Sequence, residues 1–212
     1  MNYRPLDEAR PDQLTRLREL IREASVSIRG WDYPHHSHRN DEHGGGGNFG
    51  DFYENWTDWS GFKEFWRIYK SRQFLYYSVL HEDTGQWSDG AQPGATLHAI
   101  AAAYSIFEFI EFAHRMAKAG TYKNGAAFDL RLVNTQNRYL VAGRGRMSFF
   151  DEKRFQGDTI KITHRFSQVE IMDNHLSKSV DICLEFFDYF DWAPAREQIE
   201  NEQRKFYSRQ FS

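Results

Sequence analysis

Residues 51–82 read DFYENWTDWSGFKEFWRIYKSRQFLYYSVLHE, and this stretch decides the fold. Aromatic side chains recur throughout it, and such side chains suit the pleated, half-buried surface of a β-strand. Two short breaks divide the stretch into three strand-like runs at 51–59, 62–70 and 73–82. We therefore predict an antiparallel meander. The alternative for 62–70 is a helix, because its rings also recur at helical spacing.

The segments on either side of this meander supply the helices and the remaining strands. Apolar residues recur at helical spacing over 96–118, and Gly120 follows as a C-terminal signal. Shorter helices are predicted at 11–23, 177–189 and about 194–207, and further strands at 26–28, 128–133, 139–142 and 159–166. The predicted fold is a single α+β domain over 1–212. Its antiparallel aromatic-rich sheet packs against the central helix at about 96–118, with further helices at the N- and C-termini.

The composition agrees with a folded domain whose core is built from rings. The 212 residues include 18 Phe, 11 Tyr and 6 Trp, so aromatic side chains make up 17% of the chain. A single cysteine, Cys183, excludes an internal disulfide and a Cys-based zinc site. No apolar run is long enough to span a membrane, and the charged first 30 residues lack the apolar core of a secretory signal, so we expect a cytoplasmic protein. The net charge of −3 argues against a protein that binds nucleic acid through bulk charge.

A polar segment at about 32–50 carries a cluster of potential metal ligands. Five of them fall within nine residues: His35, His36, His38, Asp41 and His43. Four consecutive glycines follow at 44–47, and because such a run is costly to order we predict a flexible His/Gly-rich loop. Histidine and carboxylate side chains are typical zinc or nickel ligands, so the loop could hold a divalent metal. The alternative that we favour is a solvated loop that binds metal only adventitiously.

The residues around the start of that loop predict a recognition surface. Arg29, Trp31, Tyr33 and His35 lie close together in the chain, and such side chains can stack on and hydrogen-bond a flat ligand. Rings and a cation of the meander complete the predicted binding surface: Trp66, Arg67, Tyr69 and Tyr77. The alternative is that the segment at 27–35 plugs the end of a strand and anchors the meander.

The same segment carries a resemblance to a known family. The run Arg29-Gly30-Trp31-Asp32-Tyr33-Pro34-His35 resembles a region of bacterial proteins that contain a Schlafen-type AlbA domain, where it lies outside the AlbA domain itself. The stretches at 64–67, 73–77, 82–83 and 107–112 resemble the same accessory region, so the likeness covers about the first 120 residues. The resemblance implies an accessory module for sensing or partner recognition and supplies no catalytic residues. The sequence shows no AlbA domain, so we expect such a module to act through a separately encoded partner.

Three functions are consistent with these patterns. The first is a non-enzymatic, cytoplasmic sensing or protein-interaction module that takes a protein partner or a small ligand. The second is a metal-dependent hydrolase in which the histidine loop holds a metal that activates water. The third, which the net charge does not favour, is a nucleic-acid-binding accessory protein that uses the basic side chains of 138–165: Arg138, Arg144, Arg146, Lys153, Arg154, Lys161 and Arg165. We expect no membrane partner, and the sequence leaves a homo-oligomer open.

Overall fold

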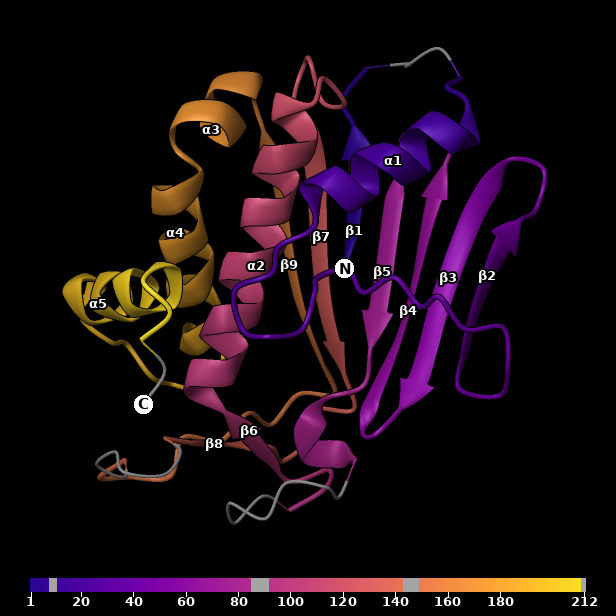
Figure 1. Ribbon diagram of the computed structural model, residues 1–212. Helices are drawn as coiled ribbons and strands as arrows, with labels where there is room; N and C mark the ends of the chain where they lie inside the picture. Colours follow the sequence, from indigo (N-terminus) through magenta and orange to yellow (C-terminus); the bar gives the residue numbers. More distant parts are fainter. Residues whose placement is uncertain (8–10, 85–91, 143–148, 211–212) are drawn as a thin grey trace.

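The structure is a computed structural model that describes residues 1–7, 11–84, 92–142 and 149–210. A seven-stranded antiparallel sheet with the strand order β2-β3-β4-β5-β1-β7-β9 forms one layer of the protein (Figure 1). Its strands are β1 (Asn2–Pro5), β2 (Gly44–Asn48), β3 (Phe52–Trp59), β4 (Phe62–Tyr69), β5 (Phe74–Ser78), β7 (Ala126–Val133) and β9 (Thr159–Phe166). The predicted α+β class with an antiparallel, aromatic-rich sheet is confirmed.

The five α-helices of the described residues form the second layer, and Figure 1 shows them on one side of the sheet. They are α1 (Leu14–Ala24), α2 (Ala99–Lys118), α3 (Gln168–Asp173), α4 (His175–Asp188) and α5 (Arg196–Tyr207). The central helix α2 contacts each of the other four helices, as its predicted role requires. None of these helices combines the length and the apolar character that a bilayer crossing requires.

Rings fill the space between the two layers. Alternate residues of each strand point to the same face of a sheet, so one set of positions in every strand meets the helices. In β4 these positions include Trp66 and Ile68, and both are fully buried. Further fully buried rings come from β1, β5, β7 and α2, among them Tyr3, Phe74, Phe107, Phe112 and Phe128. Aromatic side chains therefore form much of the core, as predicted.

Several elements differ from their predicted forms. The segment at 62–70 is the strand β4, so the helix alternative is wrong. Residues Thr96–His98 form a short strand, β6, before α2 begins, and β6 pairs in parallel with β8 (Tyr139–Val141) in a separate two-stranded sheet. The strand predicted at 26–28 is only an isolated bridge between Val26 and Tyr33. No strand was predicted at Asn2–Pro5, yet β1 joins the two halves of the main sheet between β5 and β7.

The four glycines also differ from the prediction, because Gly44–Asn48 forms the edge strand β2. Here the absence of a side chain permits close approach of neighbouring chain segments. A Cβ atom on Gly44 would lie 2.1 Å from Oγ of Ser37, and one on Gly46 would lie 2.6 Å from Nδ2 of Asn55. Ser37 and Asn55 are themselves joined, since Ser37 N donates to Asn55 Oδ1 at 2.9 Å and Asn55 Nδ2 donates to Ser37 O at 3.1 Å. The glycines thus make room for the histidine-bearing segment to lie on the sheet.

Candidate functional site

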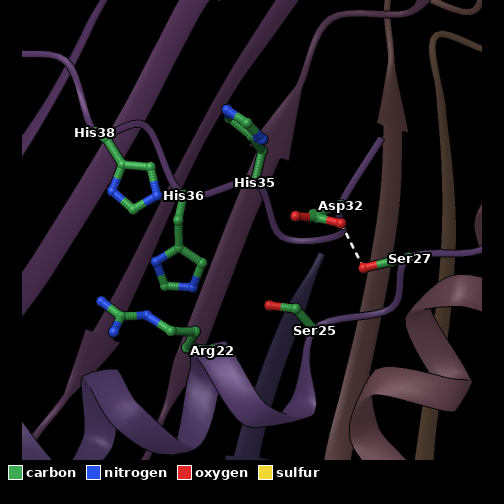
Figure 2. Close-up of a pocket in the computed structure, with 7 residues that line it drawn as sticks. All are labelled: Arg22, Ser25, Ser27, Asp32, His35, His36 and His38. Atoms are coloured by element: carbon green, nitrogen blue, oxygen red, sulfur yellow. Dashed lines mark hydrogen bonds between the residues drawn. The ribbon is translucent and has the colours of Figure 1, made fainter. Parts of the chain in front are cut away.

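A polar pocket of about 410 Å³ lies between the C-terminal end of α1 and the segment at 25–38 (Figure 2). Its lining combines one guanidinium, three imidazoles, two hydroxyls and one carboxylate: Arg22, Ser25, Ser27, Asp32, His35, His36 and His38. In Figure 2, Arg22, His36 and His38 lie on one side of the pocket, and Asp32 and Ser27 lie on the other. We call this site the histidine pocket.

The segment at 25–38 is a loop that one backbone bridge closes. Val26 N donates to Tyr33 O at 2.8 Å, and Tyr33 N donates to Val26 O at 2.9 Å. The side chain of Tyr33 is buried, and its ring centroid lies 4.7 Å from that of Tyr76, 5.0 Å from Phe109 and 5.6 Å from Phe112. Tyr33 therefore anchors the loop in the core, between β5 and α2, and leaves the residues after it at the pocket.

Side chains of strand β4 hydrogen-bond both the backbone N–H and the backbone carbonyl of His35. The carboxylate of Glu64 accepts a hydrogen bond from His35 N at 2.9 Å, and the indole Nε1 of Trp66 donates to His35 O at 2.6 Å. Glu64 and Trp66 are two residues apart, so they share the helix-facing side of the strand. The ring of Trp31 stacks between those of His35 and Phe62, with centroid distances of 4.0 Å to each. The backbone and the ring of His35 are thus both fixed.

Arg29 ties the same loop to the central helix. Its Nε donates to Glu108 Oε1 at 3.0 Å, a second bond joins the guanidinium to Glu108 Oε2, and a third reaches Ser105 Oγ at 3.3 Å. Burial raises the pKa of Glu108, and the facing Arg29 opposes that shift. Because an unpaired buried carboxylate is costly, this ion pair is a structural tie rather than a free recognition group.

The electrostatics of the pocket disfavour protonated imidazoles. The pKa of His36 is lowered to about 4, first by burial and then by the nearby Arg22, His35 and His38, while Asp32 opposes the shift. Burial also lowers the pKa of His35. At neutral pH the guanidinium of Arg22 therefore shares the pocket with the uncharged imidazoles of His35 and His36. Behind them, burial raises the pKa of Glu64 to about 7 even though Tyr76 donates to it at 2.8 Å.

The two serine hydroxyls of the pocket are committed to other partners. Ser25 Oγ donates to Ile21 O at 2.9 Å, and Ser27 Oγ donates to the carboxylate of Asp32. A serine nucleophile needs a base that accepts its proton, and in a triad-type site that base is a histidine. Neither serine hydroxyl of the pocket donates to a histidine in this way.

The predicted metal site is not formed in this arrangement. Among the residues that the structure describes, no group of three or more His, Cys, Asp or Glu side chains lies close enough to hold a metal ion. Asp41 and His43 belong to the turn that leads into β2, where Asp41 accepts from His43 N at 2.9 Å and from Arg39 at 3.2 Å. They do not line the pocket that His35, His36 and His38 share. Close spacing in the chain did not bring the five predicted ligands together, because the turn carries the last two along the sheet edge.

The eight residues of the predicted recognition surface do not form one surface, because they lie on opposite sides of the sheet. Tyr33 and Trp66 are buried in the core, and Arg29 is paired with Glu108. His35 lines the pocket, and Trp31 stacks beside it. The other three lie on the strand positions that face away from the helices: Arg67, Tyr69 and Tyr77. The segment at 27–35 contacts β4 through Trp31 and His35 and contacts α2 through Arg29, and it forms one wall of the pocket.

The basic side chains of 138–165 also do not form one surface. Arg138 is buried and paired with Asp83, and its Nη1 donates to Thr96 O at 2.9 Å, so it cannot reach a phosphate group. Arg154 pairs with Glu152 and donates to Asn137 O, and Lys153 is half-buried. Lys161 and Arg165 lie on β9 and are exposed. The remaining two cations of the prediction, Arg144 and Arg146, lie outside the described residues.

Sequence reasoning missed several residues that build the pocket, among them Arg22, Asn55 and Glu64. Arg22 lies in a helix whose charged face is typical of solvated surfaces, and Asn55 lies in a strand among rings. Glu64 carried a usable signal, because it shares the buried face of β4 with Trp66 and Ile68. A carboxylate at a core-facing position of an aromatic strand indicates a structural or functional hydrogen-bond acceptor.

No protein-family model matches this chain, no curated protein matches it, and no solved structure matches it.

Proposed function

We propose that the protein is a non-enzymatic sensing module whose histidine pocket holds a small anionic ligand with a phosphate or carboxylate group. The observation that carries this proposal is electrostatic. Arg22 and three histidines line one pocket, and burial, Arg22 and the neighbouring imidazoles oppose the protonation of His36, with Asp32 alone favouring it. An anion bound among these groups would offset that repulsion and would accept charge-assisted hydrogen bonds from Arg22 and from a protonated imidazole.

The charge of Arg22 also favours an anion over a metal cation as the ligand of the pocket. A divalent metal in the pocket would meet the positive charge of Arg22, which already lowers the pKa of His36. The pocket's single carboxylate, Asp32, accepts a hydrogen bond from Ser27. Zinc sites of the catalytic kind take three protein ligands in a fixed geometry, and the described residues offer no such group. The metal-dependent hydrolase is thus the weaker alternative.

The resemblance to the accessory region of Schlafen-type AlbA-domain proteins agrees with a sensing role. In this proposal the module responds to its anion in the cytoplasm and passes the signal to a separately encoded protein partner. A reducing compartment suits its one thiol, because Cys183 is buried among core residues and burial raises the pKa of that thiol.

Nuclear magnetic resonance of the histidine rings, with inorganic phosphate as the probe, tests the proposal. Saturating phosphate should raise the pKa of His36 from about 4 toward its ordinary value, since the anion stabilises the protonated ring. By linkage, phosphate should bind more tightly as the pH falls toward 4. Acetate, run in parallel, distinguishes a carboxylate from a phosphate as the preferred group.

Two substitutions on the same helix provide a matched pair. Arg22→Met removes the pocket's fixed cation and should weaken phosphate binding about tenfold or more, because hydrogen bonds to charged groups contribute about 1.5–3 kcal/mol. Arg16→Met removes an equivalent charge from a side chain that is 62% exposed and should leave binding unchanged. An unchanged His36 titration in both anions would reject the proposal. One zinc ion retained per chain after dialysis against a chelator would support the metal alternative instead.

A further inference from the structure

The side of the sheet that faces away from the helices carries a second set of aromatic residues. The outward positions of β3, β4 and β5 hold five rings, and the strand register places them in adjacent rows: Phe52, Trp56, Phe65, Tyr69 and Tyr77. Phe65 lies opposite Trp56 on one side and Tyr77 on the other, and Phe52 lies opposite Tyr69. Tyr77 is 58% exposed. We call this surface the open face.

A cation lies in the middle of these rings. The guanidinium carbon of Arg67 is 4.0 Å from the ring centroid of Phe52, 5.1 Å from that of Phe65 and 6.0 Å from that of Tyr69. Its Nη2 also pairs with Glu54 Oε2 at 2.6 Å. Arg67 therefore presents a planar cation beside the flat faces of three rings, which is an arrangement that stacks well with further planar groups.

The other half of the open face is basic. Ala127 on β7 lies opposite Arg4 of β1 on one side and opposite Arg165 of β9 on the other. Arg131 on β7 lies opposite Lys161 on β9. Arg131 is paired with Asp129. Within the described residues, the other three cations have no carboxylate at ion-pair distance, and all three are exposed: Arg4, Lys161 and Arg165.

The charge of the open face is opposite in sign to that of the chain. The outward strand positions hold six basic residues, namely Arg4, Lys63, Arg67, Arg131, Lys161 and Arg165. They hold three acidic residues, and each of these already has a basic partner: Glu54, Asp58 and Asp129. The whole chain has a net charge of −3. The positive charge is thus concentrated on this face, where the average composition conceals it.

We infer that the open face binds single-stranded nucleic acid, with bases stacked on the rings of β3–β5 and phosphates on the unpaired cations of β1 and β9. Rings suit this partner because every base has a π-face, and unpaired cations suit it because each nucleotide carries a phosphate. From β3 to β9 the sheet spans five strand spacings, or about 24 Å. The inference is independent of the anion proposed for the histidine pocket, which lies on the helix side of the sheet.

A second copy of this chain is the less suitable occupant. The three carboxylates of the face are already paired, so a copy docked face to face would leave Arg4, Lys161 and Arg165 without partners. Cations that are buried at an interface without a partner are costly. A polyanion supplies the missing negative charge.

Fluorescence anisotropy with a labelled 12-nucleotide oligothymidylate tests the inference on the full chain. Three phosphate contacts predict a slope of about −2 in a plot of log affinity against log salt. Affinity should therefore fall about 15-fold between 50 and 200 mM salt. The double variant Lys161→Glu/Arg165→Glu should bind at least tenfold more weakly than the wild-type chain and show a shallower salt dependence. Tyr77→Ala should weaken binding about fivefold or more, since one stacked base is lost.

Matched controls lie outside the face. Arg16→Glu/Arg204→Glu makes the same change in net charge on helices α1 and α5 and should leave affinity within about twofold. Phe150→Ala removes a fully exposed ring outside the main sheet and should have no effect. Equal losses in the two double variants would overturn the inference, as would absence of binding at 50 mM salt or equal affinity for a duplex of the same length. A dimer that Tyr77→Ala converts to monomer, without any binding to the oligonucleotide, would assign the face to self-association instead.

Discussion

The two faces of strand β4 show how one aromatic run builds two surfaces. Trp66 and its neighbour Arg67 are adjacent in sequence, but Trp66 is completely buried beneath the helices and Arg67 lies among rings on the open face. On the covered face, polar atoms have specific partners: Trp66 donates to His35 O, and Tyr76 donates to Glu64. On the open face the strand register places the rings in adjacent rows, and Tyr77 is largely exposed. The covered face holds the histidine pocket in place, and the open face is available for a partner.

The two faces should differ most in stability. Substitutions on the covered face should lower the free energy of unfolding by several kcal/mol more than substitutions on the open face. Trp66→Ala removes a fully buried indole and its hydrogen bond to His35 O, so the free energy of unfolding should fall by about 3–5 kcal/mol. Tyr77→Ala on the open face should change it by no more than about 0.5–1 kcal/mol. Urea denaturation measures both. Similar losses for the two variants would show that the open face is covered in solution.

The tie between Arg29 and Glu108 gives the next largest expected effect. Arg29→Met leaves the buried Glu108 carboxylate unpaired, so the free energy of unfolding should fall by about 2–4 kcal/mol. The double variant Arg29→Met/Glu108→Leu removes the stranded charge together with the pair and should recover part of that loss. A double variant that is less stable than Arg29→Met alone would contradict the structural account of this ion pair. The double-mutant comparison by urea denaturation is the measurement.

Glu64 should make the covered face sensitive to pH. Its pKa is about 7 in the folded protein and about 4.5 in the unfolded chain, so between these values the folded state holds a proton that the unfolded state has lost. Protonation then favours folding: the stabilising contribution is fully present below pH 4.5 and is lost as the pH rises through 7. Glu64→Gln removes this dependence, so its stability relative to the wild-type chain should rise by up to about 3 kcal/mol across that window.

Chemical denaturation at half-unit steps from pH 4.5 to 7.5 measures the difference between the two proteins. His36 acts in the opposite direction, because its pKa is lowered to about 4 and its contribution is lost as the pH falls. That contribution is common to both proteins and cancels in the difference. A constant difference across the window would show that Glu64 titrates normally.

Two neighbouring glycines of β2 test the same comparison on a smaller scale. A Cβ atom on Gly46, on the covered face, would lie within 2.8 Å of Asn55, Tyr53 and Glu54 atoms. Gly46→Ala should therefore cost about 1–2 kcal/mol and loosen the bonds between Asn55 and Ser37. On Gly47, which faces the open side, a Cβ would meet only Phe49 at 3.4 Å, so Gly47→Ala should be nearly neutral. Thermal unfolding measures both, and equal effects would favour the flexible loop predicted from the sequence.

Much of the secondary structure was predictable because its signal is local. Alternating rings identified β3, β4 and β5, and apolar spacing identified α2, although its first three predicted residues form β6. The strand β1 was not predictable in this way, because its four residues include one buried ring and are stabilised only by pairing with distant β5 and β7. The glycines of β2 were misjudged for a similar reason. Their role depends on Ser37 and Asn55, which approach them only in the folded chain.

The site was predictable only as a set of residue types. Sequence pattern by itself determined the α+β class, the aromatic core and the concentration of histidines after Tyr33, since these follow from composition and from side-chain periodicity along one segment. Only the tertiary structure decided which histidines share a pocket, that Arg22 faces them, and that Trp66 and Arg67 serve opposite faces of the sheet. The physical reason is that register and burial arise from contacts between distant segments. Those contacts shift the pKa of His36 and Glu64 and concentrate positive charge on one face of an acidic chain.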